Sequence, residues 1–164
     1  MNTLFSHVCV VTMDDRMSVW TDAFVGVTDG KISYLSKHAP EEKPDQIIDA
    51  TGMVLMPGLI NCHTHLPMQL LRGYADDLKL QEWLNDYIFP REDRLDGRCV
   101  RAATTLAVAE CLKFGVTSVS DMYYFCDDIC DVIAKSGIKA NISRGTSMFL
   151  GDDFDFEKFP ACQE

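Results

Sequence analysis

Short β-prone runs fill the first third of the chain. Apolar and β-branched residues are concentrated at 8–12, 20–28, 31–36, 47–49 and 54–56. Asp29-Gly30 separates the second run from the third, and this dipeptide between two β-prone runs is typical of a hairpin turn. The pattern therefore predicts a small β-sheet layer over residues 1–56.

From residue 57 onward the pattern changes to strands that alternate with helices. Apolar runs predict buried strands at 59–65, 116–122 and 138–143. Longer periodic segments between them predict helices at 99–114 and 127–136. This order is typical of βαβ units, so we expect a parallel sheet in an α/β fold over residues 57–164.

Local signals define the ends of these helices. Asp96 is a suitable N-cap for the first long helix, and Gly115 fits the position just after its end. Gly137 has the same place after the second helix. The connection that follows the first predicted strand contains a short helix over 80–88, which we expect Pro90 to close.

Composition and charge narrow the classes of partner. The chain has 15 basic and 25 acidic residues, which disfavours binding to a nucleic-acid backbone, and no polybasic patch suggests a membrane surface. No apolar run reaches the roughly 18 residues of a membrane span, and the first residues lack the pattern of a signal peptide. Seven cysteines, an odd number, then favour reduced thiols and a cytoplasmic location.

His63 and His65 are the candidate metal ligands. Residues two apart on a strand point to the same face, so both imidazoles can bind one ion. In an α/β barrel the active site lies at the carboxyl ends of the strands, where this pair is predicted to be. A lone His-x-His pair is a weak signal, but the β-rich segment before it and the βα units after it favour a metal site.

The segment PGLINCHTHLPMQLLRGYADDLKLQEWL, residues 57–84, resembles the amidohydrolase superfamily. Within it the chain is most similar to 5-methylthioadenosine/S-adenosylhomocysteine deaminases and related chlorohydrolases. The resemblance covers nearly the whole chain. It implies the first three strands of a (β/α)₈ TIM barrel over 57–164, preceded by part of a composite β-sandwich over 1–56. Guanine deaminases and triazine hydrolases share this leader, so the substrate is less specified than the fold.

The resemblance implies metal-dependent hydrolysis. His63 and His65, with a third His and an Asp from later barrel strands, would hold a divalent ion, usually Zn²⁺, although iron and manganese also accept imidazole. The ion would activate a water, and a later Glu and His would move protons. None of these later groups lies in this chain, so we expect the catalytic residues beyond Glu164. The remaining histidines, His7 and His38, are expected to be surface or structural residues.

Three more residues match family positions that contact substrate. Glu92, in FPREDRL, would hold the ribose hydroxyls, with a surface helix-end Glu as the alternative. Arg144, in ISRG, would face the substrate or form a structural salt bridge. Trp83 would belong to a lid over the purine or else pack in the core. Asp121 ends the second predicted strand, and we interpret it as structural.

Length sets the last expectation. A full barrel takes about 250 residues, so the 108 residues of 57–164 provide room for three strands. We therefore expect an N-terminal fragment of a hydrolase that deaminates an adenosine-type nucleoside, inactive alone and unstable or oligomeric by itself. The alternatives are a hydrolase of another amino- or chloro-substituted ring, or an inactive stub that serves as a binding or assembly partner. The complete protein is expected to be a homo-oligomer whose partner is a small nucleoside.

Overall fold

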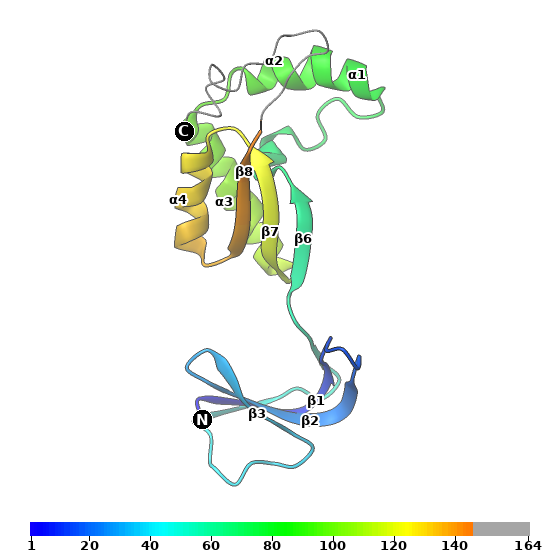
Figure 1. Ribbon diagram of the computed structural model, residues 1–164, viewed down its shortest axis with the longest axis vertical. Helices are drawn as coiled ribbons and strands as arrows, with labels where there is room; N and C mark the ends of the chain where they lie inside the picture. The colour runs from blue at the N-terminus through cyan, green and yellow to red at the C-terminus, as the bar shows by residue number, and fades with distance from the viewer. Residues whose placement is uncertain (146–164) are drawn as a thin grey trace. The chain divides into compact units, whose positions relative to one another are not determined.

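Two sheets organise the protein (Figure 1). Each sheet has its own buried hydrophobic residues. The computed structural model describes residues 1–145. The chain divides between Pro57 and Gly58 into two compact units. The sequence from Gly151 to Glu164 is acidic and aromatic, and it lies outside the described residues.

The first unit is a five-stranded mixed sheet. Its strands are β1 (Thr3–Val11), β2 (Val19–Thr28), β3 (Lys31–Ser36), β4 (Gln46–Asp49) and β5 (Val54–Leu55). The order is β3-β2-β1-β4, and β5 also pairs with β1. The hairpin partners β1, β2 and β3 are antiparallel, whereas β4 and β5 run parallel to β1. All five strands predicted in the first third are therefore present.

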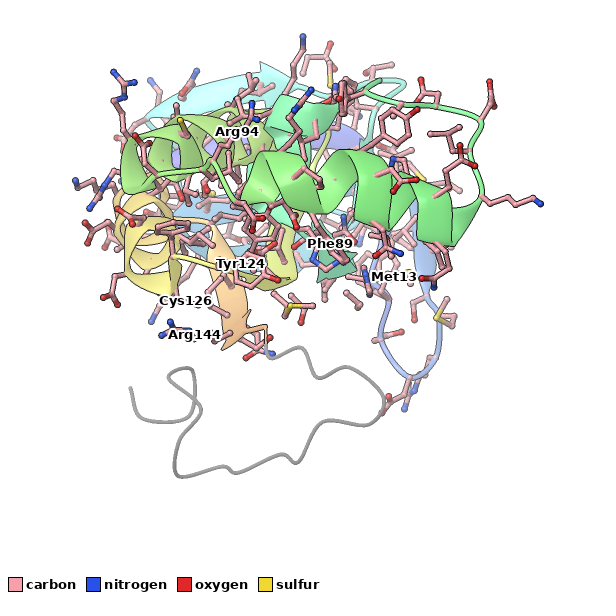
Figure 2. All side chains as sticks on the ribbon, turned by 90° about the horizontal axis from the view of Figure 1, so that it is seen from above. Met13, Phe89, Arg94, Tyr124, Cys126 and Arg144 are labelled. Atoms are coloured by element: carbon pink, nitrogen blue, oxygen red, sulfur yellow. The ribbon has the colours of Figure 1, made fainter. Side chains whose placement is uncertain are left out.

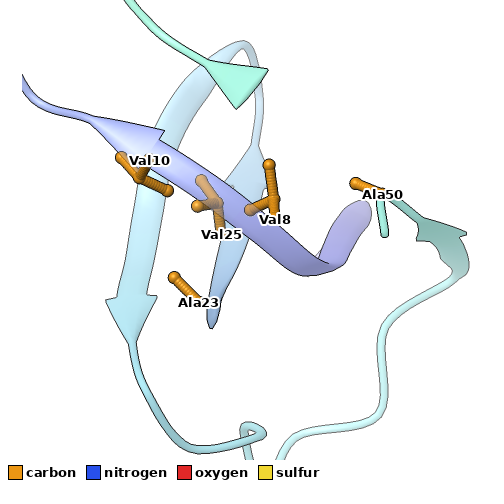
Figure 3. Packing of buried hydrophobic residues seen from close by; sticks show 5 residues of the cluster. All are labelled: Val8, Val10, Ala23, Val25 and Ala50. Atoms are coloured by element: carbon orange, nitrogen blue, oxygen red, sulfur yellow. The ribbon is translucent and has the colours of Figure 1, made fainter. Parts of the chain in front are cut away.

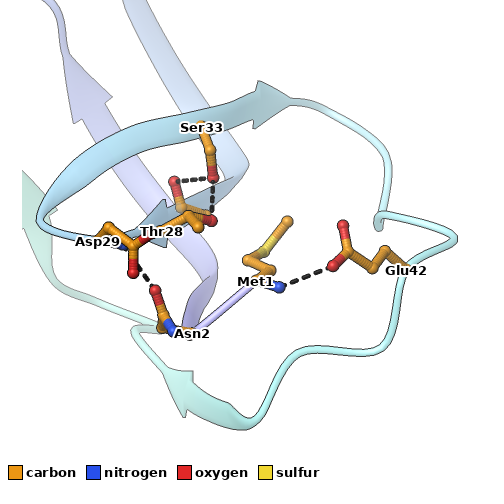
Figure 4. Close-up of polar contacts among 7 residues, drawn as sticks. Met1, Asn2, Thr28, Asp29, Ser33 and Glu42 are labelled. Atoms are coloured by element: carbon orange, nitrogen blue, oxygen red, sulfur yellow. Dashed lines mark hydrogen bonds and ion pairs between the residues drawn. The ribbon is translucent and has the colours of Figure 1, made fainter.

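The hairpin between β2 and β3 turns at Asp29-Gly30, as predicted. Both residues have positive φ, 51° and 73°, as a two-residue hairpin turn of type I′ requires. The backbone N–H of Asp29 donates to Asn2 Oδ1 at 2.7 Å, and the hydroxyls of Thr28 and Ser33 lie 2.8 Å apart across the hairpin (Figure 4). The first contact attaches the start of the chain to the turn, and the second joins the two strands of the hairpin.

Small aliphatic side chains form the core of this unit (Figure 3). Because side chains alternate along a strand, residues two apart on β1 and on β2 point to one face. The buried cluster consists of Val8, Val10, Ala23, Val25 and Ala50.

The second unit is a parallel three-stranded sheet in the order β6-β7-β8. Its elements are β6 (Leu59–Thr64), β7 (Val116–Tyr123), β8 (Lys139–Arg144), α3 (Gly97–Lys113) and α4 (Cys126–Ser136). The three arrows point the same way, and α3 and α4 lie along the sheet (Figure 1). The predicted alternation of strands and helices, and hence the mixed α/β content, is confirmed.

Capping residues define α3 as the sequence predicts. Asp96 accepts a hydrogen bond from the backbone N–H of Cys99 at 2.7 Å. Gly115, with φ 80°, follows the helix end, where the left-handed conformation favours glycine. The apolar residues between helices and sheet fall into two clusters, one around Val119 and one around Ile129.

The connection from β6 to α3 differs from the prediction in one respect. It contains η1 (Leu66–Leu71) and then a continuous helical stretch made of α1 (Leu80–Glu82), η2 (Trp83–Ile88) and α2 (Phe89–Glu92). Pro90 was expected to end the helix, and this is wrong. The backbone N–H of Phe89 bonds to Leu84 O, five residues back, so the turn just before Pro90 is a widened π turn. A wider turn avoids the clash that a proline ring makes in a regular α-helix.

Within residues 1–145, no helix is both long and apolar enough to cross a membrane.

Candidate active site

The imidazoles of His63 and His65 converge at the carboxyl end of β6. Their Nε2 atoms are 3.2 Å apart, and the ring planes are nearly perpendicular, at 83°. This arrangement follows from the sequence, because residues two apart on a strand share a face. The His63 side chain is exposed and that of His65 is partly exposed, so an ion can reach them.

The backbone of β7 selects the tautomer of the His65 ring. Nδ1 of His65 lies 2.6 Å from the carbonyl oxygen of Met122. A carbonyl only accepts, so Nδ1 carries the hydrogen and Nε2 of the neutral ring keeps its lone pair. Metal-binding histidines commonly use this arrangement, in which the second ring nitrogen donates to a carbonyl.

The spacing of the two nitrogens suits an ion with tetrahedral coordination. Zinc–nitrogen bonds of about 2.05 Å at a tetrahedral angle place two ligand nitrogens about 3.3 Å apart, close to the 3.2 Å between His63 and His65. The residues present therefore fit a metal centre. Residues 1–145 contain no group of three or more His, Cys, Asp or Glu side chains placed to hold an ion. The described part thus offers two ligands, whereas zinc sites normally use three or four protein ligands.

Asp121 holds the strand end from the opposite face. Its Oδ1 accepts from the Thr64 hydroxyl and from the backbone N–H of Leu66, both at 2.7 Å. The residue is 1% exposed, and burial raises the pKa of its carboxyl, an effect that these two hydrogen bonds partly oppose. Its contacts are those of a structural residue, in agreement with the interpretation from sequence.

A pocket of about 240 Å³ adjoins the histidine pair. His65 lines one side of it, and the helical stretch α1-η2-α2 contributes Trp83 and Glu92. Much of the remaining wall is apolar and includes Met68, Ile88 and Phe89. The structure thus brings together a candidate metal ligand, an aromatic ring and a carboxylate, which the sequence places up to 27 residues apart.

Arg144 lies in a different surface feature. It is the last residue of β8 and lies near Cys126 (Figure 2). The two line a separate open pocket of about 300 Å³ together with Asp127 and Asp128. The next residue, Gly145, does line the pocket of His65. The substrate-facing role of Arg144 remains a prediction.

The comparison with known families assigns the chain. A model described as "Amidohydrolase family" matches residues 54–152, which include His63 and His65. The chain belongs to the amidohydrolase family.

Several relatives of this amidohydrolase chain carry deaminase names. A 5'-deoxyadenosine deaminase of Methanosarcina acetivorans is 41% identical over 142 residues, which are 87% of this chain and 33% of the relative. A 5-methylthioadenosine/S-adenosylhomocysteine deaminase of Acetivibrio thermocellus is 36% identical over 147 residues, 88% of this chain and 34% of the relative. The chain thus spans about a third of the length of the curated relatives it matches.

A solved structure of similar fold contains zinc. The crystal structure of an adenosine deaminase from Xanthomonas campestris with bound zinc superposes with a TM-score of 0.76 at 36% identity. The match covers 85% of this amidohydrolase chain and 33% of that one.

Sequence reasoning missed Tyr123. Its hydroxyl donates to Glu92 Oε1 at 2.6 Å, and the residue lines the pocket beside His65. Burial, followed by the bond to Glu92, raises the pKa of the Tyr123 hydroxyl, so it keeps its proton at neutral pH and donates a hydrogen bond. Period-two alternation on β7 places Val119, Asp121 and Tyr123 on one buried face, and this signal was available in the sequence.

The groups that would move protons are expected elsewhere in the complete protein. The resemblance implies that they follow Glu164, and the described residues reach only to Gly145. Among the described residues that line the pocket shared by His65 and Trp83, Glu92 is the one carboxylate, and its Oε1 already accepts from Tyr123. The position of the catalytic residues beyond Glu164 therefore stays a prediction.

The other two histidines lie in the first unit. His7 and His38 are both exposed, and Nδ1 of His7 is 3.0 Å from Asp22 Oδ1. They occupy surface positions, as expected.

Proposed function

We propose that this chain provides two metal ligands and one wall of the substrate pocket in a hydrolase that deaminates an adenosine-type nucleoside. The proposal depends on one observation above all: the Nε2 atoms of His63 and His65 converge at 3.2 Å, beside a pocket that also contains Trp83 and Glu92. The deaminase names of relatives at 36–41% identity support the same reaction class.

Each candidate substrate-binding residue has a role that its chemistry allows. The Glu92 carboxylate can accept hydrogen bonds from two neighbouring hydroxyls, as the ribose of a nucleoside presents. Trp83 offers a flat apolar surface on which a purine or a thioether can pack. Arg144, at the end of β8, would contribute a planar donor to a substrate oxygen or carboxylate. A pocket with a few polar groups among apolar residues is typical of small-molecule sites.

The proposed metal is Zn²⁺, held by His63 and His65 and by ligands from elsewhere in the complete protein. When bound, the ion lowers the pKa of a coordinated water toward neutrality and so supplies a nucleophile. This chain's own contribution is to present two lone pairs at the right spacing, with the Met122 carbonyl fixing the tautomer of His65.

The proposed architecture follows from the same sheet. We take β6, β7 and β8 as the first three strands of a (β/α)₈ barrel, with the pocket at their carboxyl ends, where such barrels carry their active sites. Residues 1–56 would then be part of a composite β-sandwich.

A substrate panel tests the reaction. The complete protein would be supplied with zinc and assayed for ammonia release from 5'-deoxyadenosine, 5'-methylthioadenosine, S-adenosylhomocysteine and guanine, and for chloride release from a chlorotriazine. We expect turnover of at least one of the three adenosine-type nucleosides. Activity confined to guanine or the chlorotriazine would favour the hydrolase of other heteroaromatic rings, and no activity with any compound would favour the inactive stub.

Two histidine variants test the site itself. We expect His65→Ala to lower kcat by about 10³-fold or more, because it removes an ion-binding group. His38→Ala is the matched control, since it removes an exposed imidazole of the first unit and should leave kcat unchanged. Equal activity of the two variants would contradict the assignment of the metal centre.

A further inference from the structure

We propose that Tyr123 is a positioning residue that holds the Glu92 carboxylate in the orientation needed to recognise ribose hydroxyls. The inference rests on the proposed function and deepens it, because it identifies the group that makes one carboxylate selective for a hydroxylated sugar. The observation behind it is the hydrogen bond from the Tyr123 hydroxyl to Glu92 Oε1 at 2.6 Å, at the wall of the pocket.

Tyr123 is itself held firmly. It is 4% exposed and packs in the cluster formed with Val100 of α3 and Ile129 of α4. Its backbone belongs to β7, the central strand of the sheet. A hydroxyl on a ring fixed by two helices and a strand has little freedom, which is what pre-organisation of a binding group requires.

Glu92 needs such a partner more than Tyr123 does. It is the last residue of the four-residue α2, which follows the widened turn before Pro90, and its side chain is partly exposed. Such a side chain has several rotamers to choose from, and fixing it costs entropy when a ligand binds. Because Oε1 accepts from Tyr123, Oε2 keeps its acceptor sites for ligand hydroxyls.

The alternative is that the bond merely attaches α2 to the sheet. The two roles differ in what they do to substrate choice. A structural link supports binding of any nucleoside, whereas a positioned carboxylate matters only for ligands with hydroxyls to donate. The distinction can therefore be measured with a pair of substrates that differ only in these hydroxyls.

The experiment compares Tyr123→Phe with wild type in the complete protein. The substrates are 5'-deoxyadenosine and its 2',3'-dideoxy analogue. We expect KM for 5'-deoxyadenosine to rise about tenfold while kcat stays within about twofold, the signature of lost ground-state binding. With the dideoxy analogue, kcat/KM of the variant should stay within about twofold of wild type. An equal loss on both substrates, or no loss on either, would overturn the positioning role.

Two further variants and a folding control make the outcome specific. Tyr34→Phe is the matched control, because it removes a tyrosine hydroxyl that donates to His38 O at 2.8 Å in the first unit. It should leave kcat/KM unchanged for both substrates. Glu92→Gln should abolish most of the preference for the hydroxylated substrate. If Tyr123→Phe melts well below Tyr34→Phe, both variants and wild type are compared again at a temperature at which all three are folded, and we expect the same loss of preference in Tyr123→Phe alone.

The results distinguish the ribose-binding role of Glu92 from the positioning role of Tyr123. If Glu92→Gln keeps the wild-type preference, or if wild type has none, the proposed role of Glu92 is wrong and the inference falls with it. If Glu92→Gln loses the preference while Tyr123→Phe keeps it, the proposed function stands and the positioning role of Tyr123 alone is refuted.

Discussion

The Thr64 hydroxyl donates to Asp121 Oδ1 at 2.7 Å and so joins the carboxyl ends of β6 and β7. Thr64 lies between His63 and His65, and side chains alternate along a strand. Anchoring Thr64 on the buried side therefore turns both imidazoles toward the other face. The pair of nitrogens proposed to hold an ion is thus oriented by a contact that faces away from it.

Substitution of Asp121 should separate the effects of its shape and its charge. Asp121→Ala removes the acceptor for Thr64 and for the N–H of Leu66, so we expect a loss of about 1–3 kcal/mol in the free energy of unfolding. Asp121→Asn keeps an oxygen acceptor and should stay within about 1 kcal/mol of wild type at pH 7. The measurement is urea unfolding of the complete protein, monitored by tryptophan fluorescence. Equal losses in both variants would show that the hydrogen bonds to Oδ1 contribute little.

The same pair predicts a pH dependence. Burial raises the pKa of Asp121 above the unfolded value of 3.8, so the folded state binds its proton more tightly than the unfolded state does. Its contribution to stability is full below that value and is lost as the pH rises through the folded pKa. Relative to wild type, Asp121→Asn should therefore become more stable as the pH increases from 4 to 7. The opposite trend would contradict the direction of the shift.

The sequence predicts the elements of this chain well because its signals are local. Asp29-Gly30 specifies a hairpin, Asp96 and Gly115 delimit α3, and the i, i+2 spacing places His63 and His65 on one face. All of these depend on neighbours within a few residues. The prediction that Pro90 ends the helix is wrong for a physical reason. A proline lacks one backbone hydrogen bond and clashes with the preceding turn, but a π turn, with its hydrogen bond between residues five apart, can accommodate both.

Contacts between distant segments were beyond sequence reasoning. The hydrogen bond of Tyr123 to Glu92 joins residues 31 apart and depends on how α2 lies over the strand ends. Alternation on β7 predicts the buried face of Tyr123 but not its partner. The position of Arg144 outside the pocket of His65 likewise depends on where β8 ends relative to α4.

The N-cap of α3 should support stability in a way that depends on pH. The hydrogen bond from the backbone of Cys99 lowers the pKa of Asp96, so its contribution is present above 3.8 and is lost as the pH falls through the folded pKa. We expect Asp96→Ala to lower the melting temperature by about 5 °C at pH 7. Asp96→Asn, which keeps a capping oxygen, is the control and should melt close to wild type at pH 7. If both variants melt alike, the cap contributes nothing measurable.

Truncation of Ile129 should be costly. The side chain is 0% exposed and packs against Tyr123 and Val100 between α4 and the sheet. Ile129→Ala should lower the free energy of unfolding by about 2–5 kcal/mol, through lost burial and the cavity left behind. Leu106→Ala on α3 is the comparison: it removes a side chain that is 56% exposed, so a change of only about 0.5 kcal/mol is expected. A small effect of Ile129→Ala would show that the two helices close around the gap.

The 164-residue chain should self-associate when it is produced by itself. Ile60 on β6 is 68% exposed and Leu59 beside it 51%, and β6 is an edge strand of the described sheet. An exposed apolar edge is a site for pairing with another chain. We expect size-exclusion chromatography to give oligomers or aggregates and thermal unfolding to be broad. A sharp melt of a monomer would contradict this prediction.

Metal retention should differ between the chain and the complete protein. Two imidazoles at 3.2 Å form half of a tetrahedral site, and the described residues provide no third ligand beside them. We therefore expect the 164-residue chain to lose zinc on dialysis against a chelator and the complete protein to keep about one equivalent. His63→Ala in the complete protein should release this zinc, whereas His7→Ala, which removes an exposed imidazole of the first unit, should not. Stoichiometric zinc in the dialysed chain would show that its own residues complete the site, and the division of ligands proposed for the barrel would be wrong.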